Sequence, residues 1–317
     1  MFTMTTNSPM IGSAQSKYVN RRFRPKMSER RREAIAFLLF VSPNLILLSV
    51  WTFWPFFHAL YLSFTDWNLL RPTWNMVGLN NYINLLTSAT FWQIARNSVV
   101  FALGVVSATL TISMALALLL NQWLVARGFW RLVIFSPHIT TSAAMALVWV
   151  SMYDPKHGPF AAALGWLGLT FPNVLADTNL VLLALMVVAT WKGLGFSTII
   201  ILAALQGVDR TLKEAASIDG ANQRQIFRHV VFPAITPIMY FLVVTGILDA
   251  IKTFDLISVM TDGGPGNASN MFVYQIYQEA FRFQRMGYAS AISVIMFVLI
   301  MSFTYFQTRI KSRWVSY

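Results

Sequence analysis

The chain has 317 residues and a formal net charge of +12, and it is 56% hydrophobic and only 11% charged. A soluble domain carries about 25% charged residues, so this composition excludes an ordinary soluble protein and predicts a membrane protein. The chain has no cysteine, which excludes a disulfide framework and any nucleophile or metal site built on a thiol.

The first 34 residues form a polar tail that holds much of the positive charge. Its basic residues are Lys17, Arg21, Arg22, Arg24, Lys26, Arg30, Arg31 and Arg32. They precede an apolar run and are not interleaved with aromatic residues on a folded surface, so they do not indicate a nucleic-acid partner. We predict a flexible cytoplasmic extension. An electrostatic contact with anionic lipids is an alternative role for the tail.

Six mostly apolar windows follow the tail, each long enough to cross a hydrocarbon layer of about 30 Å as a helix. They cover residues 35–60, 97–120, 130–151, 178–205, 237–260 and 288–308. The first window is too long for the apolar core of a cleaved signal peptide. The sequence therefore predicts an all-α polytopic membrane protein with six transmembrane helices.

The charges of the connecting loops predict the orientation of these helices. With the tail in the cytoplasm, the loops 121–131 and 206–236 and the C-terminal end also lie there, and these segments hold most of the Lys and Arg residues. Cytoplasmic loops carry an excess of Lys and Arg in membrane proteins. Both termini are therefore predicted to be cytoplasmic.

The loop 206–236 has its own order, although it lies between two apolar windows. Thr211 or Asp209 can cap a helix through LKEAASI, Gly220 ends that helix, and a second amphipathic piece runs on to Pro233. An ordinary solvated loop needs fewer residues, and long ordered loops are more often docking sites. We predict a helix-turn-helix elbow on the cytoplasmic side of the membrane.

The fifth window contains three charged residues, Asp249, Lys252 and Asp255, at positions i, i+3 and i+6 of a continuous helix. Each costs about 2.5 to 3.5 kcal/mol at the centre of a bilayer, so they are not expected to face lipid. They either neutralise one another as a structural network or line a water-filled cavity. The sequence alone leaves both alternatives open.

The motifs of common enzymes are missing from the sequence. It has no G-x-x-x-x-G-K-[ST] loop to hold the phosphates of ATP, no H-E-x-x-H and no G-x-S-x-G. The four histidines, His58, His138, His157 and His229, fall in separate regions. We therefore predict no catalytic residues, no metal site and no cofactor in this chain.

The elbow resembles the EAA loop of permeases of ABC importers. That pattern is E-A-A, then a glycine, then I-x-L-P. Here Glu214, Ala215 and Ala216 are followed after three residues by Gly220, and after nine more residues by VVFP, which ends at Pro233. Val230 and Phe232 differ conservatively from the Ile and Leu of the pattern.

Other segments are similar to the carbohydrate-uptake branch of the same family, whose members import sugars or glycerol phosphates. These segments are SFTDWNLL, VGLNNY, ALVW, ATWKGLGF, FDLISVMTDGGPG and MGYASA. The resemblance implies a MetI-like permease fold. It divides the chain into a basic tail (1–34), a permease domain (35–310) and a cytoplasmic C-terminus (311–317), with the coupling loop at 206–236.

The resemblance implies the subunit of a type I importer in the plasma (inner) membrane of a bacterium. Its expected partners are a second, related permease, two cytoplasmic ATPases that bind ATP and Mg²⁺, an external substrate-binding protein and the lipid membrane. The coupling residues that carry over are Glu214, Ala215, Ala216, Asp219, Gly220 and Pro233. The turn Asp262 to Asn267 and the external segment 62–95 are implied contacts of the binding protein.

The same resemblance implies a solute pathway through the fourth and fifth spans. The expected pathway residues are Trp191, Lys192, Gly193, Phe196, Asp249, Lys252 and Thr253. Trp191 and Phe196 can instead be packing residues, with the glycines allowing close helix approach. His138, Thr140, Thr141 and Ser142 are weaker candidates because hydroxyls in helices often bond to their own backbone.

The implied solute is carbohydrate-like: a sugar, an oligosaccharide or a polyol glycoside. Glycerol 3-phosphate or a glycerophosphodiester is the alternative, because Lys192 and Lys252 could bind a phosphate, whereas Asp249 and Asp255 oppose a strongly anionic solute. The expected activity is transport and not an enzymatic reaction.

Overall fold

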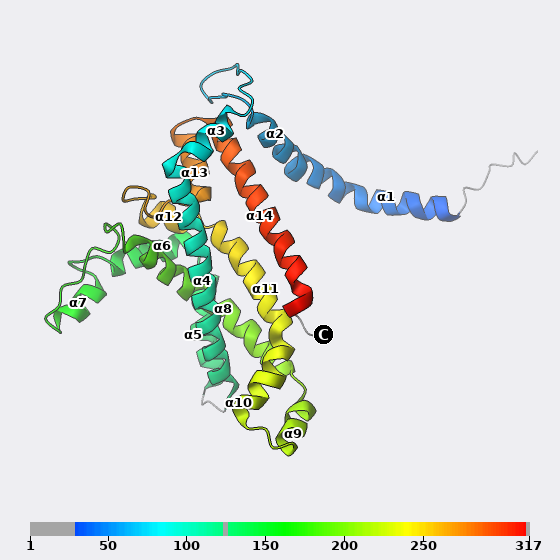
Figure 1. Ribbon diagram of the computed structural model, residues 1–317, viewed down its shortest axis with the longest axis vertical. Coiled ribbons are helices and arrows are strands. Elements are labelled where there is room, and N and C mark those ends of the chain that lie inside the picture. The colour runs from blue at the N-terminus through cyan, green and yellow to red at the C-terminus, as the bar shows by residue number, and fades with distance from the viewer. Residues whose placement is uncertain (1–28, 123–125, 315–317) are drawn as a thin grey trace, which may run out of the picture. The chain divides into compact units, whose positions relative to one another are not determined.

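The computed structural model describes residues 29–122 and 126–314, and side chains up to residue 309. Most of the predicted basic tail and the last residues of the predicted C-terminal segment lie outside this part of the chain. The described residues are mainly helical (Figure 1) and form no named strand, but Thr65 and Met76 form one isolated antiparallel bridge. Five helices are long and apolar enough to cross a membrane, or six if one bent pair forms a single span.

The chain divides into two compact units, Met1–Pro55 and Phe56–Tyr317. The first contains α1 (Glu29–Leu48) and the π-helical turn η1 (Ser49–Phe53). No side chain of either element is buried, as expected for a helix whose apolar surface faces lipid. The candidate span that begins here runs from Glu29 to Leu62, so it contains the predicted window 35–60 and starts before it.

The second unit is built around α4 (Ala89–Asn121), which packs against α8 (Val181–Gly207) and α11 (Phe232–Ile251). The last long helix, α14 (Met286–Trp314), packs against α11 and α13. One apolar cluster joins α4 to α8, α10 and α11, and another joins the middle of α4 to α6, α8 and α12. These helices correspond to the predicted second, fourth, fifth and sixth spans.

The predicted third span, 130–151, is not one helix, because the chain breaks between α5 (Arg127–Ile139) and α6 (Ser142–Met152). The two helices are bent by 101°. Thr140 and Thr141 are extended, with ψ of 142° at both. Pro137 removes a backbone donor within the last turn of α5, and β-branched Thr140 and Thr141 favour the extended conformation.

The prediction of a continuous fifth span is also wrong. The helix starts earlier, with α10 (Gln223–Ile226) and the π-helical turn η2 (Phe227–Val231) leading into α11, and it ends at Ile251. Lys252 caps that end, and α12 (Asp255–Met260) begins three residues later. A basic residue at a helix C-terminus and an acidic residue at an N-terminus both complement the helix dipole, so these two charges fit a break better than a continuous helix.

Short helices form the two ends of the second unit. At one end of Figure 1 lie α3 (Asn80–Thr87) and α13 (Phe272–Tyr277), which continues into η3 (Gln278–Arg282), and α2 (Trp54–Leu62) leads into this end. At the opposite end lies α9 (Arg210–Ile218), beside α10. The remaining short helix, α7 (Pro159–Gly165), follows α6.

Candidate functional site

A cavity of about 490 Å³ lies between α4, α5, α6, α8, α11 and the break that precedes α12. Both broken spans therefore contribute their ends to its wall. Non-helical backbone at membrane depth is tolerated where it lines a cavity, because polar groups freed by the break can find partners there. The position of the two breaks marks this cavity as the main candidate site.

Ionisable side chains converge on this cavity from four helices and one break. Its lining includes His138 from α5, Lys192 from α8, Asp249 from α11, Lys252 from the break and Asp255 from α12. Ionisable residues inside a membrane are rare and mark pathways or ligand sites. Aromatic rings from Phe101, Phe196 and Phe254 line the same space.

Asp249, Lys252 and Asp255 do not neutralise one another. All three side chains are exposed, and within residues 29–122 and 126–309 none of them is in an ion pair. The helix break separates them, so they do not share one helix face at positions i, i+3 and i+6, as they would on a continuous helix. The structural network is therefore not formed in this chain, and all three side chains lie on the cavity wall.

Lys192 and its neighbours on α8 hold both halves of the broken third span. The Lys192 ammonium donates a hydrogen bond to the hydroxyl of Ser142, the first residue of α6. One turn further along, the Phe196 ring stacks on His138 of α5, with centroids 5.3 Å apart and planes 20° from parallel. Because α8 contacts both α5 and α6 at the cavity wall, a substitution at Lys192 or Phe196 removes a direct contact with a residue beside the break.

Gly195 allows α5 to approach α8 closely. A Cβ atom at this position would lie 2.7 Å from the carbonyl oxygen of Ile134 and 2.9 Å from the Cα of Phe135. Both atoms belong to the backbone of α5, so they cannot move away without moving the helix. Small residues allow this kind of close approach in membrane helix pairs.

Six of the seven residues predicted for the pathway line the cavity: Lys192, Gly193, Phe196, Asp249, Lys252 and Thr253. Trp191 does not line it. Its ring is 37% exposed and meets Trp149 edge to face at 5.5 Å. Adjacent residues on a helix point about 100° apart, so Trp191 lies off the face that Lys192 and Phe196 share, and the packing alternative applies to it.

Sequence reasoning missed three hydroxyl residues of the cavity: Thr109 on α4, Ser197 on α8 and Thr245 on α11. The hydroxyl of Thr245 bonds to the backbone carbonyl of Phe241, as is common in helices. The buried Oγ1 of Thr109 has no hydrogen-bond partner in the described residues. No signal in the sequence separates Thr109 from the other hydroxyl residues of its helix.

The coupling loop has the helix-turn-helix form that its sequence predicts. Asp209 caps α9 by accepting a hydrogen bond from the Thr211 amide, and this bond lowers the pKa of the Asp209 carboxyl. Asp219 is the C-cap and Gly220 follows in the left-handed region, at φ +83°. The Gly220 amide donates to Ser217 and the next amide to Ala216, which is the Schellman arrangement that glycine favours.

The residues of the E-A-A motif lie on α9, with Pro233 in the first turn of α11. Glu214 is exposed and pairs with Arg210, one helical turn earlier, at 2.8 Å. Leu212 and Ile218 are also exposed, at 54% and 86%. The helix thus presents apolar and acidic side chains at the end of the unit that lies away from α3 and α13 (Figure 1).

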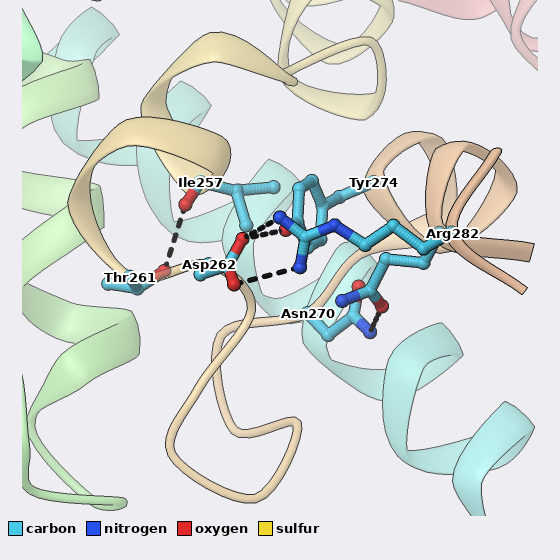
Figure 2. A network of polar contacts seen from close by, with 7 residues as sticks. Ile257, Thr261, Asp262, Asn270, Tyr274 and Arg282 are labelled. Carbon is cyan, nitrogen blue, oxygen red and sulfur yellow. Dashed lines mark hydrogen bonds and ion pairs between the residues drawn. The ribbon is translucent and has the colours of Figure 1, made fainter.

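A polar network fixes the predicted turn after α12 (Figure 2). The Asp262 carboxylate accepts hydrogen bonds from both terminal nitrogens of Arg282, at 2.7 and 2.8 Å, and from the Tyr274 hydroxyl. The Arg282 bonds, followed by the Tyr274 bond, lower the pKa of Asp262, and burial raises the pKa of Tyr274 to about 12. The network ties the turn to α13 and η3.

The chain matches the family described as "Binding-protein-dependent transport system inner membrane component" over residues 32–316. It is 32% identical over 284 residues to the sn-glycerol-3-phosphate transport system permease protein UgpA of Agrobacterium fabrum, covering 88% of this chain and 95% of that protein. It is also 32% identical over 276 residues to the trehalose/maltose transport system permease protein MalF of Thermococcus litoralis, covering 86% of this chain and 92% of that protein.

A solved bacterial ABC transporter involved in the import of the acidic polysaccharide alginate has a chain with the same fold. The TM-score is 0.78 at 20% identity, and the match covers 89% of this chain and 96% of that one. The fold and the cavity at broken spans define a membrane-spanning permease. The chain belongs to the family of inner membrane components of binding-protein-dependent transport systems.

The comparisons confirm the predicted family and the MetI-like permease fold. The relatives are named as permease proteins of transport systems, so the prediction of a transporter subunit and not an enzyme is also confirmed. The family description makes a binding protein part of the system. The roles of individual residues in the cavity and the coupling loop remain predictions.

Proposed function

We propose that this chain forms one half of the pathway by which an ABC importer takes up a carbohydrate-like solute: a sugar, an oligosaccharide or a polyol glycoside. The observation that carries this proposal is the cavity at the two broken spans, where Lys192, Asp249, Lys252 and Asp255 meet three phenylalanine rings. Carboxylates and ammonium groups bond to hydroxyls, and aromatic faces contact the apolar faces of sugar rings. Phe196 is one of these rings, and Gly193 and Thr253 also line the wall.

Glycerol 3-phosphate or one of its diesters is the second candidate solute. The positive charges of Lys192 and Lys252 would offset the negative charge of a phosphate group. A relative from Agrobacterium fabrum is named for sn-glycerol 3-phosphate transport. Asp249 and Asp255 line the same cavity and repel a dianion, so a neutral hydroxylated solute agrees better with the balance of charge.

The solute can be identified by mass spectrometry of the ligand that co-purifies with the cognate binding protein. We expect a neutral carbohydrate. A phosphorylated ligand would favour the second candidate, and a ligand with few hydroxyl groups would contradict the carbohydrate proposal.

The open side of the cavity supports a second, related permease as the partner. If Asp249, Lys252 and Asp255 faced lipid, their cost at the bilayer centre would be about 8 to 10 kcal/mol. A second permease that covers this side would place them in a shared, water-filled pathway. Mass measurement of the intact complex tests this. We expect two different permeases, and two copies of this chain would contradict the heterodimer.

We propose that α9 couples this chain to one of two cytoplasmic ATPases, which bind the ATP and Mg²⁺. Its cap at Asp209, its Schellman turn at Gly220 and its exposed Leu212 and Ile218 make a fixed helix with an uncovered apolar surface. Such a helix can transmit closure of the ATPases to the spans as rigid-body movement. The remaining motif residues, Glu214, Ala215, Ala216, Asp219 and Pro233, keep the roles that the resemblance implies.

Charge reversal on α9 tests the coupling proposal. Glu214→Lys should abolish solute-stimulated ATP hydrolysis while the subunit still inserts, because the exposed Glu214–Arg210 pair contributes only about 0 to 1 kcal/mol. Arg210→Gln is the control, since it breaks the same pair and keeps the carboxylate. Normal stimulation in Glu214→Lys, or equal loss in both variants, would contradict a docking role for Glu214.

The proposed orientation places both termini and α9 in the cytoplasm of a bacterium, with the chain in its plasma (inner) membrane. The basic loops support it, because Lys and Arg are enriched on the cytoplasmic side. Protease digestion of sealed inside-out vesicles tests it. Cleavage within the loop 206–236 is expected, and cleavage confined to the α3–α13 end would contradict the orientation.

A further inference from the structure

A second cavity, of about 270 Å³, is lined by residues of α3 and α13. These two helices lie at one end of the unit (Figure 1). The walls of the cavity come from α3, the start of α4, α13, η3 and the start of α14. It shares no lining residue with the larger cavity. It is therefore a separate space, at the opposite end of the unit from the coupling helix.

Glu279 contributes a buried carboxylate to this second cavity. Its side chain is 4% exposed, and no other Asp, Glu, Lys or Arg among residues 29–122 and 126–309 is buried. Gln275 donates a hydrogen bond to one carboxylate oxygen at 2.7 Å. The Nε and Nη2 atoms of Arg285 lie 2.8 and 2.6 Å from the other oxygen. A buried charge is costly unless it is paired and hydrogen-bonded, and here it is both.

Arg285 is held in place on more than one side. Its guanidinium lies 5.0 Å from the centre of the Tyr288 ring and 5.6 Å from that of Phe283. Its backbone amide also donates to the Glu279 carbonyl, at 2.7 Å. A guanidinium has five N–H donors, more than the Glu279 carboxylate takes up, so Arg285 keeps donors for another molecule. Its side chain is 54% exposed.

The charges of the second cavity balance, which restricts what it can bind. A bound cation would be repelled by Arg285, and a bound anion would be repelled by Glu279. Neither kind of ion would therefore find a net opposite charge in the cavity. The polar groups of the lining are the spare donors of Arg285, a lone pair of Glu279, the amide of Gln275 and the hydroxyls of Ser88, Thr90 and Tyr288. They both donate and accept hydrogen bonds, as the hydroxyl groups of a sugar or polyol do.

The apolar part of the cavity matches the same class of molecule. Phe91 and Phe272 line it, with ring centres 5.9 Å apart, beside the Tyr288 ring. Aromatic rings beside a few polar groups are typical of ligand pockets, and the volume is at the small end of the range of about 300 to 1,000 Å³. We infer that this cavity is a second binding site, for a neutral polyhydroxylated molecule the size of one sugar ring, separate from the transport pathway.

The test uses the assembled transporter in lipid nanodiscs, with D-glucose as the probe in saturation-transfer NMR. Thr245→Phe fills the larger cavity, and Thr90→Phe fills the second one from its exposed rim. Thr87→Phe is the matched control, because Thr87 is also exposed, ends α3 and does not line the cavity. We expect glucose binding to persist in Thr245→Phe and Thr87→Phe, and to disappear when Thr90→Phe is added to Thr245→Phe.

Two further variants keep the test valid if Thr90→Phe does not assemble. Glu279→Gln removes the carboxylate charge and Tyr288→Phe removes a hydroxyl group, each with little change of shape. Loss of a hydrogen bond to a charged group weakens binding by about 10-fold or more, so the glucose dissociation constant should rise by that factor in Glu279→Gln. Tyr288→Phe should raise it less.

Three outcomes would overturn the inference. No glucose binding in the Thr245→Phe background would show that the second cavity is not a sugar site. Glucose binding that survives all three changes at Thr90, Glu279 and Tyr288 would place it elsewhere. Displacement of glucose by inorganic phosphate would show that the site prefers anions. None of these outcomes bears on transport through the larger cavity.

Discussion

Gly195→Ala should impair transport, because it forces α5 away from α8 at the cavity wall. The new Cβ would lie 2.7 Å from the Ile134 carbonyl oxygen and 2.9 Å from the Phe135 Cα. Carbon atoms normally lie about 3.5 to 4.0 Å apart, so α5 must move by about 0.5 to 1 Å. That movement displaces the end of α5, where His138 stacks on Phe196.

The size of the effect follows from the cost of overpacking, about 1 to 3 kcal/mol. The better helix propensity of alanine returns up to about 1 kcal/mol, so the protein should still assemble. If the strain falls on one of the two conformations of the transport cycle, the balance between them shifts by about 5- to 150-fold. We expect the rate of solute uptake into proteoliposomes to fall within that range.

Two other glycines of α8 provide controls for this experiment. Gly207→Ala should transport normally, since a Cβ there meets nothing within 4 Å. Gly193→Ala should have an intermediate effect, because its nearest neighbour, at 3.2 Å, is the methyl group of the Thr109 side chain. Uptake at the wild-type rate by Gly195→Ala would refute the close contact between α5 and α8 as a requirement for transport.

Two further predictions concern charged residues. Lys252→Met should assemble normally and lose uptake. Adding Asp249→Asn and Asp255→Asn should not restore uptake, because no ion pair joins these residues. A reduced assembly yield in the single variant that the triple variant recovers would instead support the structural network. Asp262→Asn should lower the hydrogen-exchange protection of residues 262–282 at neutral pH. Because Arg282 lowers the pKa of Asp262, the stabilisation from the Asp262 carboxylate is present above the usual carboxyl pKa of about 4 and is lost as the pH falls further. The wild type should therefore resemble the variant only in acid. Equal protection of both proteins at pH 7 would contradict the role of the network.

Local signals predicted some features of the fold and failed on others. The apolar windows predicted every long helix, because about 20 apolar residues suffice to identify a span. The coupling loop was predicted from Asp209 and Gly220, whose capping roles depend only on their own neighbours. The breaks after Ile139 and Ile251 were missed, because a hydropathy window averages over Thr140 and Lys252 instead of reporting the backbone at those residues.

Charges in the apolar runs and the family resemblance predicted part of the cavity wall, but neither pointed to its hydroxyl residues Thr109, Ser197 and Thr245. Lys192 and Asp249 were conspicuous because a charged residue in an apolar run needs an explanation. Trp191 was included because the family resemblance implied it, although the helical period points its side chain away from the face that Lys192 shares with the cavity. Glu279 and Arg285 resemble ordinary loop charges in the sequence, since burial of Glu279 depends on contacts with segments far away in the chain.

The absence of cysteine from the chain permits a direct test of the central claim, that the solute passes through the larger cavity. Thr245→Cys places one thiol in the cavity wall, and Thr111→Cys places one on an exposed position of α4 outside it. In the assembled transporter, a small water-soluble thiol reagent should label Cys at position 245, and solute delivered by the binding protein should slow that labelling about 10-fold or more when the occupied fraction exceeds 90%. Labelling at position 111 should not respond to solute. Labelling at position 245 that is absent, or equally fast with and without solute, would contradict the proposed pathway.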